Sequence, residues 1–383
     1  MKQLVFLYWG CAFLMYLSQV YYPCGSLAGG IEDKAARLRS RYMDIFMVAA
    51  IAWMTCFSFL RTSYNDTGTY IIHFQQSESV ADFFARGGLL DWTGNPLSEL
   101  YRDLIRSITE NYHIYFFFPA FLSSYAVVKL CKKYSPSPAF SVLIFFSIGT
   151  YVMYIAALKQ CFAVFFLLLA LPYAIDRKYV RFYLLVFVAI LFHTHAFMFA
   201  VIPLLMDKPW GKVSWILLGL TVFAMLTYNF TLGAFMEYAQ SLGANVAEEE
   251  VFDDHAINIL RVVVYWIPAF LAFVFQRRLF RDSSRTENLF VNMSLLSAFI
   301  LMIGLVQGAN LYARMAAYFE IATVIALPWM IQKLFTKPSA KFVTACAVVF
   351  YFVYFLYEFG VSKGFGEGYR AITLWQFIAS LFV

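Results

Sequence analysis

The sequence predicts an all-α protein that crosses a membrane many times. Hydrophobic residues make up 62% of the 383 residues and charged residues only 14%. An ordinary soluble chain has roughly 45–50% apolar and about 25% charged residues, because a soluble fold needs a largely polar surface. The apolar residues also fall into long runs, and about 20 such residues span a bilayer as a helix. This composition excludes a soluble globule and a disordered chain.

The apolar runs divide the whole chain without a linker or an internal repeat, so we expect one integral membrane domain over residues 1–383. We expect the first run to be retained as a helix, because it is longer than the apolar part of a signal peptide. The runs lie at about 4–22, 43–60, 113–130, 139–158, 160–175, 179–206, 213–232, 257–276, 287–307, 314–332 and 340–359, with a short one at 371–383.

Lysine and arginine gather between alternate runs and predict the orientation. Cytoplasmic loops carry an excess of these residues, so the formal net charge of +6 is assigned to topology and not to nucleic-acid binding. Both ends of the chain are then expected on the outer side, with about twelve crossings. The basic clusters lie at about 34–41, 129–133, 177–181, 208–212, 277–285 and 333–341.

Run 179–206 fits this orientation only as a helical hairpin with His193, Thr194 and His195 at its tip. Each arm of roughly 12–14 residues would rise about 18–21 Å, which is less than the hydrocarbon thickness. The tip is therefore expected below the outer surface, inside protein or a wet cavity, because irregular backbone at that depth is tolerated only there.

Two outer segments are expected to be long. Residues 61–112 contain two stretches, 70–85 and 96–108, with apolar residues at the i, i+3, i+4 spacing of helices that lie in the membrane interface. Residues 233–256 hold six acidic residues and are expected to form a solvated outer loop.

A few ionisable residues are not explained by topology and fall at outer helix ends or at the hairpin tip. Charge within a span is costly and tends to face a cavity. Basic side chains from distant parts of the chain suit an anionic head group such as pyrophosphate. The positions of Arg61 and Arg314 are explained equally well by side chains that snorkel to the interface. Asp66 has the alternative of a simple turn residue, and Glu320 that of only a partner for Arg314. The set is Arg61, Asp66, Lys159, His193, His195, Arg314, Glu320 and Arg370.

The order of these residues resembles that of the EpsG/Wzy-type polymerases of bacterial polysaccharide repeat units. The likeness covers about 57–206 well and the rest of the chain loosely. Lysine at 159 replaces the usual arginine, and a Gly-x-Asp after Arg61 is missing. The matching residues are Arg61, Asp66 and Tyr70, the stretch 95–101, Lys159 with Gln160, the stretch 192–195, and Arg314 with Tyr318.

The resemblance implies a GT-C-like fold and a glycosyltransferase in the bacterial plasma membrane. Its substrates would be glycans on undecaprenyl pyrophosphate, and a chain-length regulator, a flippase and membrane lipids its partners. We expect no cofactor and no metal. His193, His195 and Asp66 are the expected catalytic residues, Arg61, Lys159 and Arg314 the pyrophosphate ligands, and Tyr70, Gln160, Tyr318 and Glu320 the residues that orient substrate. A flippase of lipid-linked oligosaccharides and a membrane O-acyltransferase are the alternatives.

Overall fold

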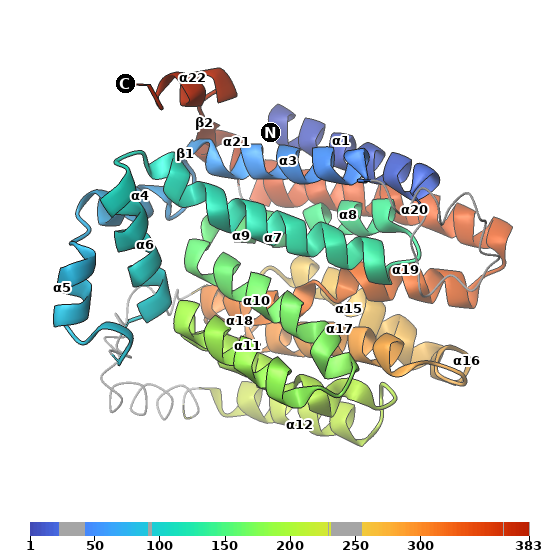
Figure 1. The fold of residues 1–383 in the computed structure, drawn as a ribbon. Coiled ribbons are helices and arrows are strands. Elements are labelled where there is room, and N and C mark those ends of the chain that lie inside the picture. Colours follow the sequence, from blue (N-terminus) through green and yellow to red (C-terminus); the bar gives the residue numbers. More distant parts are fainter. Residues whose placement is uncertain (23–42, 91–93, 229, 231–254, 363, 383) are drawn as a thin grey trace.

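The computed structural model describes the chain except for residues 23–42, 91–93, 229, 231–254, 363 and 383. The described residues form a bundle of long helices that run side by side, with short helices across one end (Figure 1). The predicted all-α class is confirmed, with two short strands as the exception. The predicted acidic loop at 233–256 falls almost entirely outside the described residues.

Five of the described helices are long and apolar enough to span a membrane, and two bent pairs, α8 with α9 and α18 with α19, raise this to seven. Five shorter apolar helices accompany them, and the expected twelve crossings, which count these as spans, stay a prediction. The bundle consists of α1 (Lys2–Tyr21), α3 (Ile45–Phe59), α7 (Tyr112–Tyr134), α8 (Pro138–Ser147), α9 (Thr150–Ala156), α10 (Leu158–Ile175), α11 (Tyr179–Phe192), η2 (Thr194–Met206), α12 (Lys212–Leu226), α15 (Ile259–Val274), α16 (Gln276–Leu279), α17 (Arg285–Ile303), α18 (Ala309–Glu320), α19 (Thr323–Leu334) and α20 (Lys337–Leu356), which continues into the π-helical turn η3 (Tyr357–Ser362).

The two bent pairs meet at their breaks. The α8–α9 break of 57° occurs at Gly149, whose φ of 89° lies in the left-handed region that favours glycine. The α18–α19 pair bends by 54° after Glu320. The Thr150 hydroxyl at the start of α9 donates a hydrogen bond of 2.9 Å to Glu320 at the end of α18. One buried contact therefore fastens both breaks together.

The predicted hairpin is present as α11 and η2. The first arm ends at Phe192, and His193 adopts an extended backbone that turns the chain. The arms run antiparallel, because the rings of Phe182 and Phe199 pack together and Tyr183 donates a hydrogen bond to the carbonyl of Ala200. The second arm is a 3₁₀ helix, which rises about 2.0 Å per residue against 1.5 Å for an α-helix. It is therefore longer than the α-helical arm that the sequence predicts.

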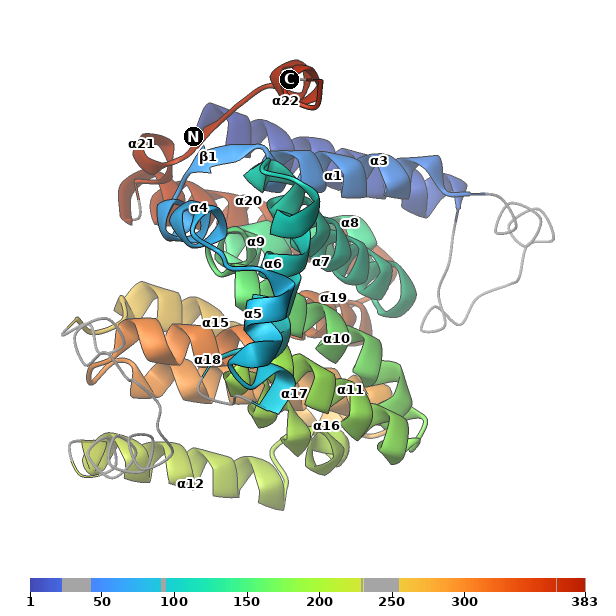
Figure 2. The ribbon, with the colours of Figure 1, turned by 60° about the vertical axis from the view of Figure 1, so that its left-hand side comes forward.

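The cover helices, α4 (Thr67–Gln75), α5 (Val80–Ala85) and α6 (Pro96–Ile108), lie across one end of the bundle with the short η1 (Gly88–Leu90) between α5 and α6 (Figures 1 and 2). The expected helix at 96–108 is confirmed. The expected helical stretch at 70–85 is present as two helices, α4 and α5, because Ser79 and Asp82 form a capping box that starts a new helix. Hydrogen bonds from Ser79 also lower the pKa of Asp82.

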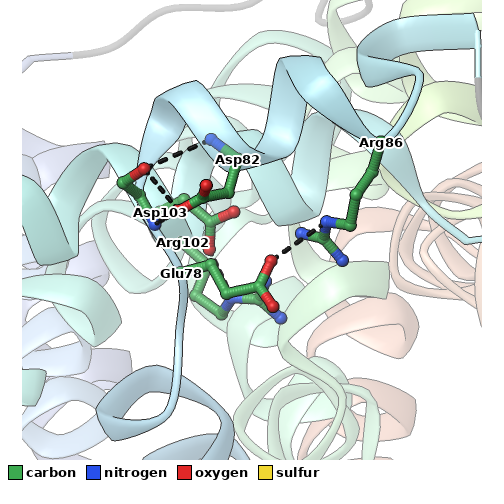
Figure 3. Close-up of polar contacts among 6 residues, drawn as sticks. Glu78, Asp82, Arg86, Arg102 and Asp103 are labelled. Atoms are coloured by element: carbon green, nitrogen blue, oxygen red, sulfur yellow. Dashed lines mark hydrogen bonds and ion pairs between the residues drawn. The ribbon is translucent and has the colours of Figure 1, made fainter.

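Ion pairs stabilise the polar face of these cover helices (Figure 3). Glu78 and Arg86 pair at 3.0 Å across α5, and both are half exposed. On α6, Arg102 pairs at 2.8 Å with its neighbour Asp103, whose side chain is fully buried. The exposed pair contributes little to stability, whereas burial of Asp103 requires Arg102 as its partner.

The end of the chain returns to the start of the cover. Strands β1 (Arg61–Ser63) and β2 (Arg370–Ala371) pair antiparallel, which the sequence does not predict. Between η3 and β2, the short α21 (Phe365–Gly368) approaches the N-terminus so closely that a Cβ at Gly366 would lie 2.8 Å from the Met1 nitrogen. The last helix is α22 (Leu374–Ala379). Both termini thus lie at the covered end of the bundle (Figure 1).

A buried ion pair closes the opposite end. Lys132 of α7 lies 2.6 Å from Asp44 and donates a hydrogen bond of 2.9 Å to the carbonyl of Ser18. Lys132 belongs to the basic cluster that the sequence assigns to topology, but it is buried and also joins the ends of α1, α3 and α7.

Candidate functional site

Most of the predicted site residues lie in the cover helices or in contact with them. They come from four places that are distant in sequence: the start of α4, the start of α10, the hairpin tip and α18. Their short-range contacts fall into three groups, which are described in turn. The residues are Asp66, Tyr70, Lys159, Gln160, His193, His195, Arg314 and Tyr318.

The first group centres on the hairpin tip. The Tyr318 hydroxyl and Nδ1 of His193 are 2.6 Å apart and share a hydrogen bond. The rings of His193 and His195 have centroids 5.2 Å apart. The positive charges of Arg314 and Lys159 both act on His193. Two histidines, a phenol and two cations from three separate elements are therefore neighbours.

The second group joins the starts of α4 and α10 to α18. Arg314 and Asp66 form an ion pair of 3.6 Å, and both side chains are partly exposed. Gln160 donates a hydrogen bond of 2.7 Å to the carbonyl of Arg314. Tyr70 interacts electrostatically with the charges of Asp66 and Arg314. The alternative that Glu320 is the partner of Arg314 is wrong, since Asp66 takes that place.

The third group ties Lys159 and the hairpin tip to the cover. Lys159, which is half-buried at the start of α10, experiences the charges of Glu99 and Arg102 on α6. The backbone N–H of Thr194 donates a hydrogen bond of 3.0 Å to the side chain of Asn95, the residue before α6. Helix α6 is therefore linked both to the histidine tip and to the start of α10.

Arg61 stands apart from these groups. It is 2% exposed, and its guanidinium donates hydrogen bonds of 2.6 Å to the Ser58 carbonyl and 3.1 Å to the Thr67 hydroxyl. It also stacks over the Phe116 ring at 4.1 Å. From this packed position, the charge of Arg61 acts on Tyr70. The structure brings Lys159 and Arg314 to His193 and does not bring Arg61 with them, and its role as a pyrophosphate ligand stays a prediction.

Glu320 leads to a residue that the sequence reasoning missed. Its buried carboxylate lies 3.7 Å from the guanidinium of Arg261 on α15, in addition to its bond from Thr150. The feature of the sequence that indicates Arg261 is its charge within the apolar run 257–276. Its place near one end of that run makes this charge less conspicuous. The predicted Arg370 lies exposed in β2, away from these contacts.

These three groups combine side chains that can exchange protons with side chains that can bind an anion. A histidine with a hydrogen-bonded ring nitrogen can hold or accept a proton, and arginine and lysine can hold a phosphate or carboxylate. Among the residues that the structure describes, no three His, Cys, Asp or Glu side chains gather as ligands for a metal ion.

Comparison with known proteins identifies the family. A search of curated proteins and a search of solved structures each found no match. The family model described as the EpsG family matches residues 44–371, which is most of the chain and includes every residue of the three groups. The resemblance inferred from the sequence is confirmed, and the protein is a multi-pass membrane protein of the EpsG family, the EpsG-type polysaccharide polymerases.

Proposed function

We propose that this protein polymerises a bacterial surface polysaccharide, such as an O-antigen, exopolysaccharide or capsule, at the outer face of the plasma membrane. It transfers a growing glycan from undecaprenyl pyrophosphate to the terminal sugar of a lipid-linked repeat unit. The observation that carries the proposal is the hydrogen bond between His193 and Tyr318 beside Arg314 and Lys159. Membership of the EpsG family supports the reaction class.

In the transfer, a hydroxyl oxygen of the acceptor sugar attacks the anomeric carbon of the donor. The bond between that carbon and the pyrophosphate oxygen breaks, and undecaprenyl pyrophosphate leaves with the electron pair. The hydroxyl proton passes to a protein base. Positive charge builds on the sugar and negative charge on the leaving group, so the reaction needs a base on one side and fixed cations on the other.

His193 and His195 are the proposed bases, with Asp66 as a further candidate. If the Nδ1–H of His193 donates to the Tyr318 oxygen, Nε2 is left with the lone pair that accepts the proton. Tyr318 would then act by fixing the tautomer and the ring orientation of His193. The second histidine ring, 5.2 Å away, would pass the proton onward or contact the acceptor.

Arg314 and Lys159 are the proposed ligands of the leaving pyrophosphate, because their charges act on His193 from two different helices, α18 and α10. A guanidinium and an ammonium supply the positive charge that this step needs, so the proposed mechanism uses no metal. Gln160 holds the backbone at Arg314 in place. Arg61 reaches the same pyrophosphate only if it leaves Ser58 and Thr67; otherwise it supports Tyr70.

The test is complementation of a strain that lacks the gene, with glycan length measured on gels. Arg314→Ala and Lys159→Ala are expected to abolish long polymer and leave single repeat units, because loss of one fixed charge lowers such rates by about 10²–10³-fold. Arg61→Ala tests whether that guanidinium also contacts substrate. Arg281→Ala, an exposed charge near α16, is the matched control.

Two results would overturn the proposal. Normal chain length in both the Arg314 and the Lys159 variants, at normal protein level, would remove the assigned leaving-group ligands. Loss of all surface glycan in the deletion strain, without accumulated single units on the outer face, would instead indicate a flippase.

A further inference from the structure

A polar cavity of about 370 Å³ lies next to the ion pair of Arg314 and Asp66. Asn65, Asn310 and Arg261 are among the residues that line it, and Tyr64 forms part of its wall. Asn65 precedes Asp66 in the chain. Asn310 lies one helical turn before Arg314, so Asn310 and Arg314 share a face of α18. The cavity therefore borders the proposed reaction centre but is built from other residues.

The guanidinium of Arg261 has unused hydrogen-bonding capacity. Its Nη2 lies 3.7 Å from the carboxylate of Glu320, and its Cζ lies over the Tyr265 ring, 5.8 Å from the ring centroid. Its Nε is buried and has no hydrogen-bond partner among the residues that the structure describes. A buried donor without a partner is costly, which makes a ligand that accepts from it favourable.

The charge around Arg261 indicates the kind of ligand. The carboxylates of Glu320 and Glu358 both act on this guanidinium, and both are buried. Two carboxylates face one guanidinium, so the lining of the cavity has no excess positive charge with which to hold a pyrophosphate. Hydrogen-bonding groups without net charge are the better match, and the side chains of two asparagines supply both donors and acceptors.

We propose that this cavity is a saccharide subsite that holds one sugar unit of the lipid-linked substrate beside the reaction centre. Sugar hydroxyls accept from Arg261 and exchange hydrogen bonds with Asn65 and Asn310, while the Tyr64 ring packs against a sugar face. Its volume lies at the lower end of the range of about 300–1,000 Å³ for small-molecule sites, which fits a small sugar unit. The inference rests on the proposed polymerase function and adds the position at which the sugar is recognised.

Arg261 would then determine specificity without taking part in bond cleavage. Glu320, which the sequence predicts as a residue that orients substrate, would act through Arg261. The Thr150 hydroxyl, which holds Glu320 from the other side, completes this support.

The test measures binding and polymerisation separately on the full-length protein in lipid nanodiscs. The binding probe is the free repeat-unit oligosaccharide released from the host polysaccharide, which carries neither lipid nor phosphate, and calorimetry follows its binding. Asn310→Ala changes an exposed side chain and leaves the core intact. Arg261→Met with Glu320→Gln removes this ion pair as a unit, so Glu320 is not left as an unpaired buried charge.

Both variants are expected to weaken oligosaccharide binding at least tenfold and to raise the KM for the lipid-linked repeat unit, with kcat much less affected. Inhibition by undecaprenyl pyrophosphate, which has no sugar, should stay unchanged. Arg314→Ala is expected to bind the oligosaccharide normally while it fails to polymerise.

Equal binding by wild type and both variants, or no binding by wild type, would overturn the saccharide subsite and leave the polymerase proposal intact. The opposite outcome separates the two proposals in the other direction. If wild type binds the oligosaccharide but makes no polymer, and the Asn310 and Arg261 variants lose that binding, the subsite is supported and the polymerase is refuted.

Discussion

The contact between Tyr318 and His193 is the most informative polar pair at the residue scale. Tyr318 is buried in α18, and its hydroxyl reaches a ring nitrogen at the hairpin tip. A buried phenol normally finds a hydrogen-bond partner, and here that partner is an imidazole nitrogen, which can donate or accept a proton. The pair thus couples helix packing to the state of a proposed base.

Removal of the Tyr318 hydroxyl is therefore expected to slow polymerisation. Tyr318→Phe keeps the ring that packs in the core and takes away only the group that fixes the His193 tautomer. We expect a rate lower by about 10²-fold, at the low end of what acid–base groups contribute, measured as repeat units added per minute to lipid-linked acceptor. Tyr125→Phe, which removes a hydroxyl that contacts Lys129 near the end of α7, is the control. Equal rates for both variants would refute the role of Tyr318.

The ion pair of Asp66 and Arg314 allows function to be separated from stability. Both partners are more than one-third exposed, and exposed pairs contribute only about 0–1 kcal/mol to folding. Asp66→Asn is thus expected to leave the thermal unfolding temperature within about 2–4 °C of wild type, because ~1 kcal/mol causes a shift of that size in shorter chains of about 150–250 residues and a smaller shift in longer ones.

Polymer length in the same Asp66→Asn variant should nonetheless fall sharply, as seen on glycan gels, because Arg314 loses its anchor and a candidate base disappears. Asp176→Asn breaks a similarly exposed pair with Lys178 and serves as the comparison. Long polymer from the Asp66 variant would show that this carboxylate is only a turn residue.

The sequence predicted which polar side chains come together better than how they pair. Charged residues at helix ends in an apolar chain are conspicuous, so Asp66, Lys159, the two histidines and Arg314 could be listed in advance. Their partners could not, because pairs such as Asp66 with Arg314 depend on how distant helices pack. Arg61 illustrates the limit: its position suggests an open site, yet the fold encloses it under Phe116.

At the scale of elements, the hairpin of α11 and η2 places the histidines. Its length in sequence and the charge pattern predicted it. The 3₁₀ geometry of the second arm could not be predicted, because long 3₁₀ runs are uncommon and tertiary packing decides them. The division of 70–85 was readable in hindsight, since Ser79 and Asp82 have the spacing of a capping box.

The hairpin leads to a topology test. In a variant without native cysteines, Thr194→Cys is expected to react with a membrane-impermeant maleimide in intact cells, because Thr194 is exposed at the tip. Lys178→Cys, in the turn between α10 and α11, should react only after the membrane is permeabilised. Labelling of both from the same side would contradict the hairpin and the orientation predicted from basic residues.

At the scale of the whole molecule, the C-terminal segment stabilises the covered end. Phe365 is buried, the rings of Phe57 and Tyr369 stack at 4.5 Å, and Tyr369 donates a hydrogen bond to the Phe57 carbonyl. Next to this cluster, β2 pairs with β1 at Arg61. The segment therefore holds the start of the cover helices in place.

Deletion of residues 365–383 is expected to lower both stability and activity. Loss of a single buried aromatic side chain costs about 3–5 kcal/mol, and β1 would lose its pairing strand. We expect a lower thermal unfolding temperature in detergent and shorter polymer in cells. Deletion of only 381–383, which removes exposed residues and a residue outside the described structure, should change neither. An unchanged unfolding temperature after the larger deletion would show that the segment is dispensable.

Composition and the spacing of apolar runs were enough to predict a helical membrane protein. The bends in α8–α9 and α18–α19 were not visible, because Gly149 looks like any glycine in an apolar run and no proline marks the break after Glu320. The β1–β2 pairing was also hidden, because two or three residues carry no readable alternation.

The contact between Thr150 and Glu320 has a consequence for motion within the bundle. It fastens the inner ends of α9 and α18, so a tilt at either break carries both half-helices as one body. Asn310, Arg314 and Tyr318 would travel together on α18 and keep their mutual spacing. If the protein extends a polymer as proposed, such a joint tilt would move Arg314 and Tyr318 together relative to His193 and Lys159, which lie on other elements, and would open the reaction centre between additions.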